Sequence, residues 1–414
     1  MPYITYFHVT LEASFNISFQ YHFRHYLHLN FLIGLILMKY IFVFLSLFDP
    51  QIPYAPNGVG FSLLISLILF PLVIAAPLNT TTLYLIKQGK PFCWLFFMAL
   101  IIILSRVMLS QGQGFEFTLS WLKAFIVFLS SLLVFIVFFQ SQKPIDLINA
   151  IIFSFLANAL INFIVGTFPE PFVFLELFRT VTISDSLSLN PYRNSFISGS
   201  GYFSIGTAYG IFCLFYAYLL SKKNSLIGVI TFSIISITAI MAARTSLFAI
   251  FLATILITLG SKKNLLYFAI PILLFPFLDS QLSNYYSWIQ SFFNFYKDPS
   301  GQVIMNDMYF WPGLNIFLYG QGDTNNGVFT YTDSGYMKDI LFGGIIFMLI
   351  KLTFVFVFFF KTYKKHFIFS FFFCISILIF QIKGAYIYNN AQGMAIFYFI
   401  YFSLILNNKI KFLR

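Results

Sequence analysis

Charged residues are scarce in this sequence. Lys, Arg, Asp and Glu make up 9% of its 414 residues, and only 13 of them are acidic, whereas 59% of the chain is hydrophobic. A soluble fold of this size needs far more charged surface than that. The composition therefore excludes nucleic-acid binders, disordered regulators and cytosolic enzymes, and predicts a protein embedded in a membrane.

Cysteine and histidine are also scarce. The three cysteines all lie inside apolar runs: Cys93, Cys213 and Cys374. This placement argues against a disulfide framework or a metal centre and favours lipid-facing or packing roles. His22, His25 and His28 have helical spacing, but no carboxylate or cysteine accompanies them, which favours an interfacial helix over a metal site. We predict neither a metal nor a cofactor.

Apolar runs long enough to cross about 30 Å of hydrocarbon recur along the chain. They predict about twelve transmembrane helices, within a range of roughly ten to thirteen, because the short runs beside Arg244 form either two spans or one broken pair. The predicted spans are 31–48, 61–78, 91–109, 118–139, 146–167, 202–220, 226–242, 245–260, 265–279, 339–360, 366–382 and 392–407. The predicted fold class is an all-α polytopic integral membrane protein, with one transmembrane domain (31–414) after an interfacial segment (1–30).

Basic residues predict the orientation. With an even number of spans, most of them fall in loops on one side, which the positive-inside rule makes cytoplasmic: Arg24, Lys87, Lys90, Lys143, Lys222, Lys223, Lys262, Lys263, Lys361, Lys364, Lys365, Lys409, Lys411 and Arg414. Both termini are then cytoplasmic, and residues 1–30 lack the apolar core of a cleavable signal. The net charge of +11 needs no anionic partner, so no nucleic acid is expected.

Two loops on the opposite, outer face are much longer than ordinary connections, about 34 residues at 168–201 and about 60 at 280–338. The larger is rich in aromatic and amide side chains, which suit the C–H faces and hydroxyl edges of a sugar. We predict glycan contacts from Tyr336, Trp311 and Asn325. The alternative is an aromatic belt at the membrane interface.

Four of the six arginines lie on or just beneath the outer face, against the positive-inside trend: Arg106, Arg179, Arg193 and Arg244. A guanidinium group binds phosphate bidentately and keeps its charge when buried. Arg244 separates two apolar runs, so we expect it at membrane depth facing a cavity. Arg193 and Arg244, with Arg179 as a third, are predicted to bind a pyrophosphate. The alternatives are snorkelling to the interface or pairing with an acidic neighbour.

Carboxylates are the candidate proton acceptors of the outer face, because all five histidines are predicted to be cytoplasmic. Asp333 lies at the mouth of a span, and Asp323 follows a glycine turn that can bring backbone close to a ligand. Asp333 has three interpretations: a helix N-cap, a group that orients the substrate, or a general base. Lys39 and Lys351, inside apolar runs, are interpreted as snorkelling, with shifted spans as the alternative.

Three segments resemble one family in order and spacing: PYRNSFISGSGYFSIGTAYG (191–210), AARTSLF (242–248) and LYGQGDTNNGVFTYTDSGYMKDILFGGII (318–346). Together with the many spans and two large outer loops, they resemble the bacterial O-antigen polymerases of the Wzy type. In that family an arginine precedes a glycine-containing turn into a span, a short Arg-Ser/Thr element follows, and a G-x-G turn leads through an aspartate to D-x-G-Y.

The resemblance implies block-wise polymerisation of a surface polysaccharide on the periplasmic face of the bacterial inner membrane. Donor and acceptor would both be undecaprenyl-pyrophosphate-linked oligosaccharide repeat units, and a chain-length regulator would be a partner. The family has arginines in both large outer loops. Here 280–338 contains only Lys297 and Lys338 as basic residues, so any basic contact from this loop is a point charge.

The chemistry follows separately from the substrate. A sugar C1 on pyrophosphate already has a good leaving group, so the protein has to stabilise the departing charge and orient the acceptor hydroxyl. Arginines supply the first role, and the scheme requires no divalent metal.

Two alternatives remain. An O-antigen ligase resembles the polymerases but carries a functional histidine in its large outer loop, and 280–338 contains none. A lipid-linked oligosaccharide flippase or other transporter is not an enzyme. It would show repeated halves with interrupted helices and a basic path to the cytoplasmic side, which the sequence does not suggest.

Overall fold

The computed structural model describes residues 37–55, 59–75, 79–109, 115–139, 144–168, 170–179, 191–198, 201–260, 263–264, 302, 306–323 and 332–412. Within these ranges the chain is helical, and its only extended pairing is an isolated antiparallel bridge between Gln51 and Gly60. Five of the described helices are long and apolar enough to cross a membrane. This agrees with the predicted class, an all-helical membrane protein.

The described helices follow most of the predicted spans. They are Leu37–Phe48, α2 (Phe61–Ala75), α3 (Thr80–Leu109), α4 (Phe115–Phe138), α5 (Pro144–Thr167), α9 (Tyr202–Leu220), α10 (Leu226–Ala242), α11 (Ser246–Gly260), α16 (Gly335–Lys383) and α17 (Ala391–Phe412). The bounds of α9 and α10 coincide with the predictions, and α3 begins well before its apolar run. The segment 1–30 and the span 265–279 lie outside the described residues, so the count of twelve stays a prediction.

Two predicted spans form the single helical run α16, which folds back on itself. Its backbone leaves the helical region at His366. The rings of Phe358 and Phe373 stack with centroids 4.1 Å apart, and the hydroxyls of Thr362 and Ser370 lie 2.7 Å apart. A straight helix would separate 15 residues by about 22 Å. α16 is therefore a hairpin, as the two spans 339–360 and 366–382 require.

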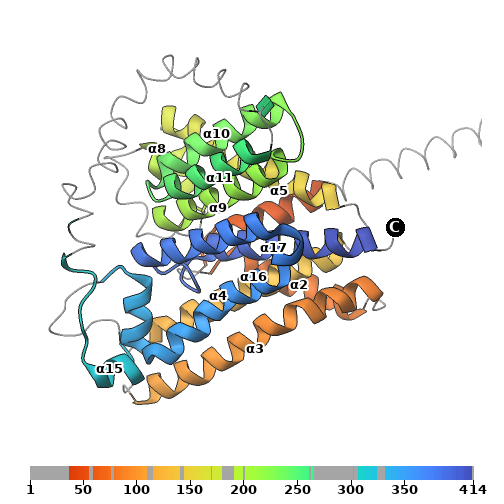
Figure 1. The fold of residues 1–414 in the computed structure, drawn as a ribbon. Coiled ribbons are helices and arrows are strands. Elements are labelled where there is room, and N and C mark those ends of the chain that lie inside the picture. The colour runs from red at the N-terminus through yellow and green to blue at the C-terminus, as the bar shows by residue number, and fades with distance from the viewer. Residues whose placement is uncertain are drawn as a thin grey trace, which may run out of the picture.

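The centre of the bundle is formed by α17 and α9, whose side chains are almost all buried, while α3 lies at its edge with most of its apolar side chains exposed. Figure 1 shows α17 between the helix group of α9, α10 and α11 and the group of α2, α3 and α4. Aromatic rings fill the centre. For example, the ring centroid of Phe92 lies within 6.1 Å of those of Phe128, Tyr398 and Tyr401, in tilted or edge-on geometry.

The two ends of the bundle carry different groups. α9 is 19 residues long, which corresponds to about 28 Å. At its first end a Cβ on Gly384 would lie 2.7 Å from the ring of Phe203, and one on Gly335 would lie 2.8 Å from Ala385. At its other end Asn264 donates to the carbonyl oxygen of Leu220 at 2.7 Å. We call the first the arginine end, because Arg179, Arg193 and Arg244 lie there, as described next.

The two long loops contain short helices. The first includes α6 (Phe172–Glu176) and α8 (Pro191–Asn194), and the second includes α15 (Leu314–Tyr319). α8 packs against α5 and α10, whereas α15 packs against α16. In Figure 1 α8 and α15 lie on opposite sides of the bundle.

Candidate functional site

The segment 191–198 is held on the surface of α5 by polar side chains. The side-chain amide of Asn158 makes two hydrogen bonds with the backbone of Ile197. Its oxygen accepts from the N–H at 3.0 Å, and its NH₂ donates to the carbonyl at 3.1 Å. Asn162 donates to the carbonyl of Tyr192, whose hydroxyl lies 3.2 Å from that of Thr167. Asn158 and Asn162 are one helical turn apart, so one polar face of an otherwise apolar helix fixes this segment.

Arg179 is buried beside this segment. Only 6% of the residue is exposed. Its Nε donates to the carbonyl of Phe196 at 3.1 Å, its Nη2 donates to the same oxygen, and the guanidinium carbon lies 5.2 Å from the ring centre of Phe172. Its Nη1 has no hydrogen-bond partner among the described residues. Burial lowers the pKa of Arg179 to about 10, against the fields of Tyr202 and Glu176, so it is still a cation at neutral pH.

Arg193 contacts the ring of Tyr202. It belongs to α8, and its guanidinium carbon is 4.1 Å from the ring centre of Tyr202, the first residue of α9. Such a cation–π contact fixes the plane of the guanidinium group without using its five N–H donors. Tyr202 thus contacts Arg193 and also interacts electrostatically with Arg179.

Arg244 occupies a break between two helices. α10 ends at Ala242 and α11 begins at Ser246. Gly228 at the start of α10 and Gly260 at the end of α11 both approach the Leu220–Ser221 end of α9, so the two runs are antiparallel helices along α9, which favours two spans over one broken pair. A Cβ on Gly206, one turn into α9 from Tyr202, would lie 2.3 Å from the Cβ of Ala243. Because Gly206 has no side chain, the turn that carries Arg244 packs against the first turn of α9. Tyr202, in the same turn of α9, contacts Arg193.

The structure consequently brings the three predicted arginines to one end of α9, on α8, on the turn after α6 and on the α10–α11 break. Guanidinium groups gathered at one end of a bundle suit an anion with several oxygens, because each fork donates two parallel hydrogen bonds. We call Arg179, Arg193 and Arg244 the arginine cluster.

Asp333 lies at the arginine end but is not a helix cap. The N-cap of α16 is Ser334, whose hydroxyl accepts from the N–H of Met337 at 3.4 Å, so the capping interpretation of Asp333 is wrong. The side chain of Asp333 is 43% exposed and forms an ion pair with Lys338 at 3.5 Å. Asp333 is two residues before Gly335, which packs against Ala385. The adjacent Gly384 packs against the ring of Phe203, the neighbour of Tyr202, so Asp333 and Tyr202 lie on the same face.

Asp323 follows a glycine turn that docks on α16. Gly320 and Gly322 have φ of 71° and 80°, a region that favours glycine. The N–H of Gln321 donates to Leu341 at 2.7 Å and that of Gly322 to Phe342 at 3.0 Å. This turn follows α15, which lies on the other side of the bundle from α8 (Figure 1).

The predicted glycan residues differ in accessibility. Trp311 is 64% exposed and packs against the ring of Phe317 at 5.3 Å, so its other surface is open to a sugar. The hydroxyl of Tyr336 donates to the carbonyl of Leu378 at 2.9 Å, across the α16 hairpin, which leaves mainly its ring edge for a ligand. Asn325 lies outside the described residues.

α16 also contains a buried ion pair that the sequence did not predict. Lys351 and Asp339 are 2.5 Å apart with exposed side-chain fractions of 0% and 1%, so the snorkelling interpretation of Lys351 is wrong. Gln381 donates to the second oxygen of Asp339 at 2.9 Å. Lys39 is also buried, with its nitrogen 5.5 Å from the ring centre of Phe139. For both Lys351 and Lys39, the sequence signal for a buried cation was a lysine within an apolar run.

Among the described ranges, no three His, Cys, Asp or Glu side chains gather as a set that could hold a metal ion. Compared with known proteins, the chain matches no protein-family model, no curated protein and no solved structure. Any functional assignment therefore rests on the arginine cluster, the carboxylates near it and the sequence pattern that contains them.

Proposed function

We propose that this protein is a bacterial O-antigen polymerase, a glycosyltransferase that joins undecaprenyl-pyrophosphate-linked oligosaccharide repeat units at the periplasmic face of the inner membrane. Both termini are then cytoplasmic, the arginine end is periplasmic, and a chain-length regulator is an expected partner. The observation that carries this proposal is the arginine cluster around the start of α9. Three cations at one helix end can offset the charge of a lipid-linked pyrophosphate and the further negative charge that develops on it as it leaves.

In this proposal the cluster binds the donor pyrophosphate and stabilises the charge that develops on it as the C1–O bond breaks. Arg193 is held against the ring of Tyr202, and Arg179 contributes its remaining Nη1. Both are held before the substrate arrives, so little reorganisation is needed during the reaction. The acceptor sugar hydroxyl attacks C1 and loses its proton, and the lipid pyrophosphate departs.

Asp333 is the better placed of the two carboxylates to receive that proton or orient the hydroxyl, because it is accessible and lies on the same face as Tyr202. Asp323, beyond α15, fits contact with the more distant part of the glycan, together with the open ring of Trp311. A general base must come within hydrogen-bond reach of the proton that it removes, which favours Asp333 over Asp323 as the base.

The test is polymerisation in vitro. Purified protein in nanodiscs is supplied with its native lipid-linked repeat unit, products are separated by size, and released lipid pyrophosphate is assayed. We expect a ladder at repeat-unit intervals, and we expect Arg193→Ala and Arg244→Ala each to slow it about 100-fold, the usual effect of removing a preorganised donor. Arg193→Lys should recover only part of the rate, because it restores the charge but not the fork.

The matched control is Lys361→Ala, which removes a cation from an exposed position before the turn of the α16 hairpin, away from the arginine end. Its rate should equal that of the unaltered protein. Asp333→Asn should slow chain extension while leaving lipid-linked donor binding intact. Folded protein that makes no ladder would overturn the proposal.

A transporter is the second candidate, favoured by one observation. The pair of Lys351 and Asp339 lies in the apolar interior of the bundle, and ionisable groups at such positions are common in transport pathways. Movement of the lipid-linked oligosaccharide across a vesicle bilayer, without a ladder and dependent on Lys351, would support this candidate instead.

A further inference from the structure

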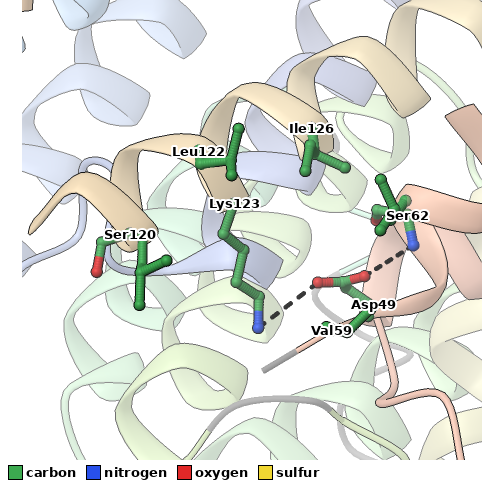
Figure 2. A pocket seen from close by; sticks show the side chains of 10 residues that line it. Asp49, Val59, Ser62, Ser120, Leu122, Lys123 and Ile126 are labelled. Atoms are coloured by element: carbon green, nitrogen blue, oxygen red, sulfur yellow. Dashed lines mark hydrogen bonds and ion pairs between the residues drawn. The ribbon is translucent and has the colours of Figure 1, made fainter. Parts of the chain in front are cut away.

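A cavity of about 400 Å³ lies between the start of α2 and the first half of α4. It is on the side of the bundle where the N–H of Gln51 donates to the carbonyl of Phe178, the neighbour of Arg179, but none of the three arginines lines it. Its polar lining is Asp49, Ser62, Ser120 and Lys123, and its walls are aliphatic, from Val59, Leu63, Leu119, Leu122 and Ile126. Figure 2 shows Lys123 extending from α4 toward Asp49, with Ser62 on the other side of the carboxylate. No step of the proposed polymerase reaction uses these groups.

Asp49 is held in the cavity by its surroundings. It is 1% exposed, and one carboxylate oxygen accepts from the N–H of Ser62 at 2.9 Å. Its φ of 39° is in a region that non-glycine residues adopt rarely. A Cβ on Gly60 would lie 2.1 Å from the same carboxylate, so the position of Asp49 depends on the absence of a side chain at Gly60. The backbone at Asp49 is therefore strained, and its carboxylate is buried.

Two polar groups of the cavity have capacity left for a ligand. Lys123 is 27% exposed and lies 3.7 Å from Asp49, an ion pair longer than a hydrogen bond, so its N–H donors remain available. The hydroxyl of Ser62 is buried without a hydrogen-bond partner in the described part of the chain. A buried hydroxyl without a partner is costly, and a bound polar group removes that cost.

The cavity continues into a surface that suits an acyl chain. Ser62 is the second residue of α2, and Lys123 lies eight residues, or about 12 Å, from the start of α4, so the polar groups are near the helix ends. Leu119 and Leu122 on α4 and Leu64 and Leu67 on α2 are exposed apolar side chains beside them. A polar floor near the helix ends, with aliphatic walls that lead to exposed apolar side chains, suits a lipid headgroup and its acyl chains.

We propose that this cavity binds a zwitterionic phospholipid whose headgroup ends in a primary ammonium, as in phosphatidylethanolamine. Lys123 binds the phosphate as a point charge, and Ser62 donates to it. The ammonium group donates to Asp49, whose carboxylate has lone pairs beyond those used by Ser62 and Lys123. The acyl chains lie over Leu119 and Leu122.

Charge and shape distinguish this ligand from others. The opposite charges of Asp49 and Lys123 leave the cavity without a net charge, so an anionic headgroup gains less there than at the arginine cluster. A trimethylated ammonium cannot donate a hydrogen bond to Asp49. A sugar favours aromatic faces, and none of the residues that line this cavity is aromatic.

The test is native mass spectrometry of the full chain in detergent, offered equal amounts of dioleoyl phosphatidylethanolamine, phosphatidylcholine and phosphatidylglycerol. We expect phosphatidylethanolamine to be retained about fivefold more than either other lipid, since one charge-assisted hydrogen bond separates them. Lys123→Met should abolish the preference. Leu122→Trp, which fills the cavity and keeps both charges, should lower retention of all three lipids.

The matched control is Lys338→Met. Lys338 has the same exposed fraction as Lys123, 27%, and pairs with Asp333 at 3.5 Å, but it does not line the cavity. This variant should keep the preference. Equal retention of the three lipids by the unaltered protein, preference for phosphatidylglycerol, or unchanged retention in both Lys123→Met and Leu122→Trp would overturn the proposal. Thermal unfolding of each variant confirms that it is folded.

Discussion

Two ion pairs at the start of α16 combine the same residue types and differ in burial. Asp339 and Lys351 are 2.5 Å apart with side chains 1% and 0% exposed, whereas Asp333 and Lys338 are 3.5 Å apart with side chains 43% and 27% exposed. The buried pair is surrounded by further partners, with Gln381 on the carboxylate and the ring of Tyr388 at 5.1 Å from the ammonium. The exposed pair lies at the arginine end beside the start of the helix.

The difference separates an architectural role from a chemical one. Moving two charges out of water costs free energy, and only the attraction between the two partners offsets that cost. A buried pair therefore holds together the structural elements that carry its two residues. Asp339 and Gln381 lie on the two arms of the α16 hairpin, and Gln381 also accepts from the N–H of Tyr386 at 2.8 Å. The exposed pair costs little to form or break, so its carboxylate stays accessible to a substrate.

The largest effect should follow from breaking the buried pair. Lys351→Met leaves Asp339 buried without its cation, and we expect a loss of about 3 to 5 kcal/mol in the free energy of unfolding. The measurement is unfolding in detergent, followed by intrinsic fluorescence. Adding Asp339→Asn removes the remaining charge and keeps an acceptor for Gln381, so the double variant should recover much of the loss. A single variant as stable as the unaltered protein would show that the pair does not hold the hairpin.

A smaller effect is expected at the turn between Asp339 and Lys351. Gly344 has a φ of 74°, and a Cβ there would lie 2.3 Å from the carbonyl oxygen of Leu318. Gly344→Ala should therefore cost about 2 kcal/mol or more, through backbone strain and lost docking of the glycine turn. Gly201→Ala is the control, since its φ is −74° and a Cβ there meets nothing within 4 Å. Equal stability of the two variants would contradict this role of Gly344.

Some of this arrangement could be predicted from the sequence and some could not. The bounds of α9 and α10 followed from apolar runs interrupted by Lys222 and Lys223, because hydrocarbon thickness sets span length. The break at Arg244 followed from a cation between two runs. These are local signals, and a single window of sequence carries them.

The pairing of Asp339 with Lys351 is not a local signal. In a straight helix the two residues would be about 18 Å apart, and only the left-handed conformation at Gly344 brings them together. The contact of Arg193 with Tyr202, and the electrostatic interaction of Tyr202 with Arg179, depend on how 191–198 lies over α5. The sequence identified the arginines, but their relation to Tyr202 follows from tertiary packing.

The smallest effect should follow from breaking the exposed pair. Lys338→Met is the same substitution as Lys351→Met, on the same helix, yet we expect the free energy of unfolding to change by at most about 0.5 kcal/mol, because exposed ion pairs are screened by solvent. Unfolding in the same detergent measures both variants together. If Lys338→Met destabilised the protein as much as Lys351→Met, burial would not be what separates the two pairs. Asp333 would then belong to the architecture of the hairpin, and its proposed part in catalysis would lose its support.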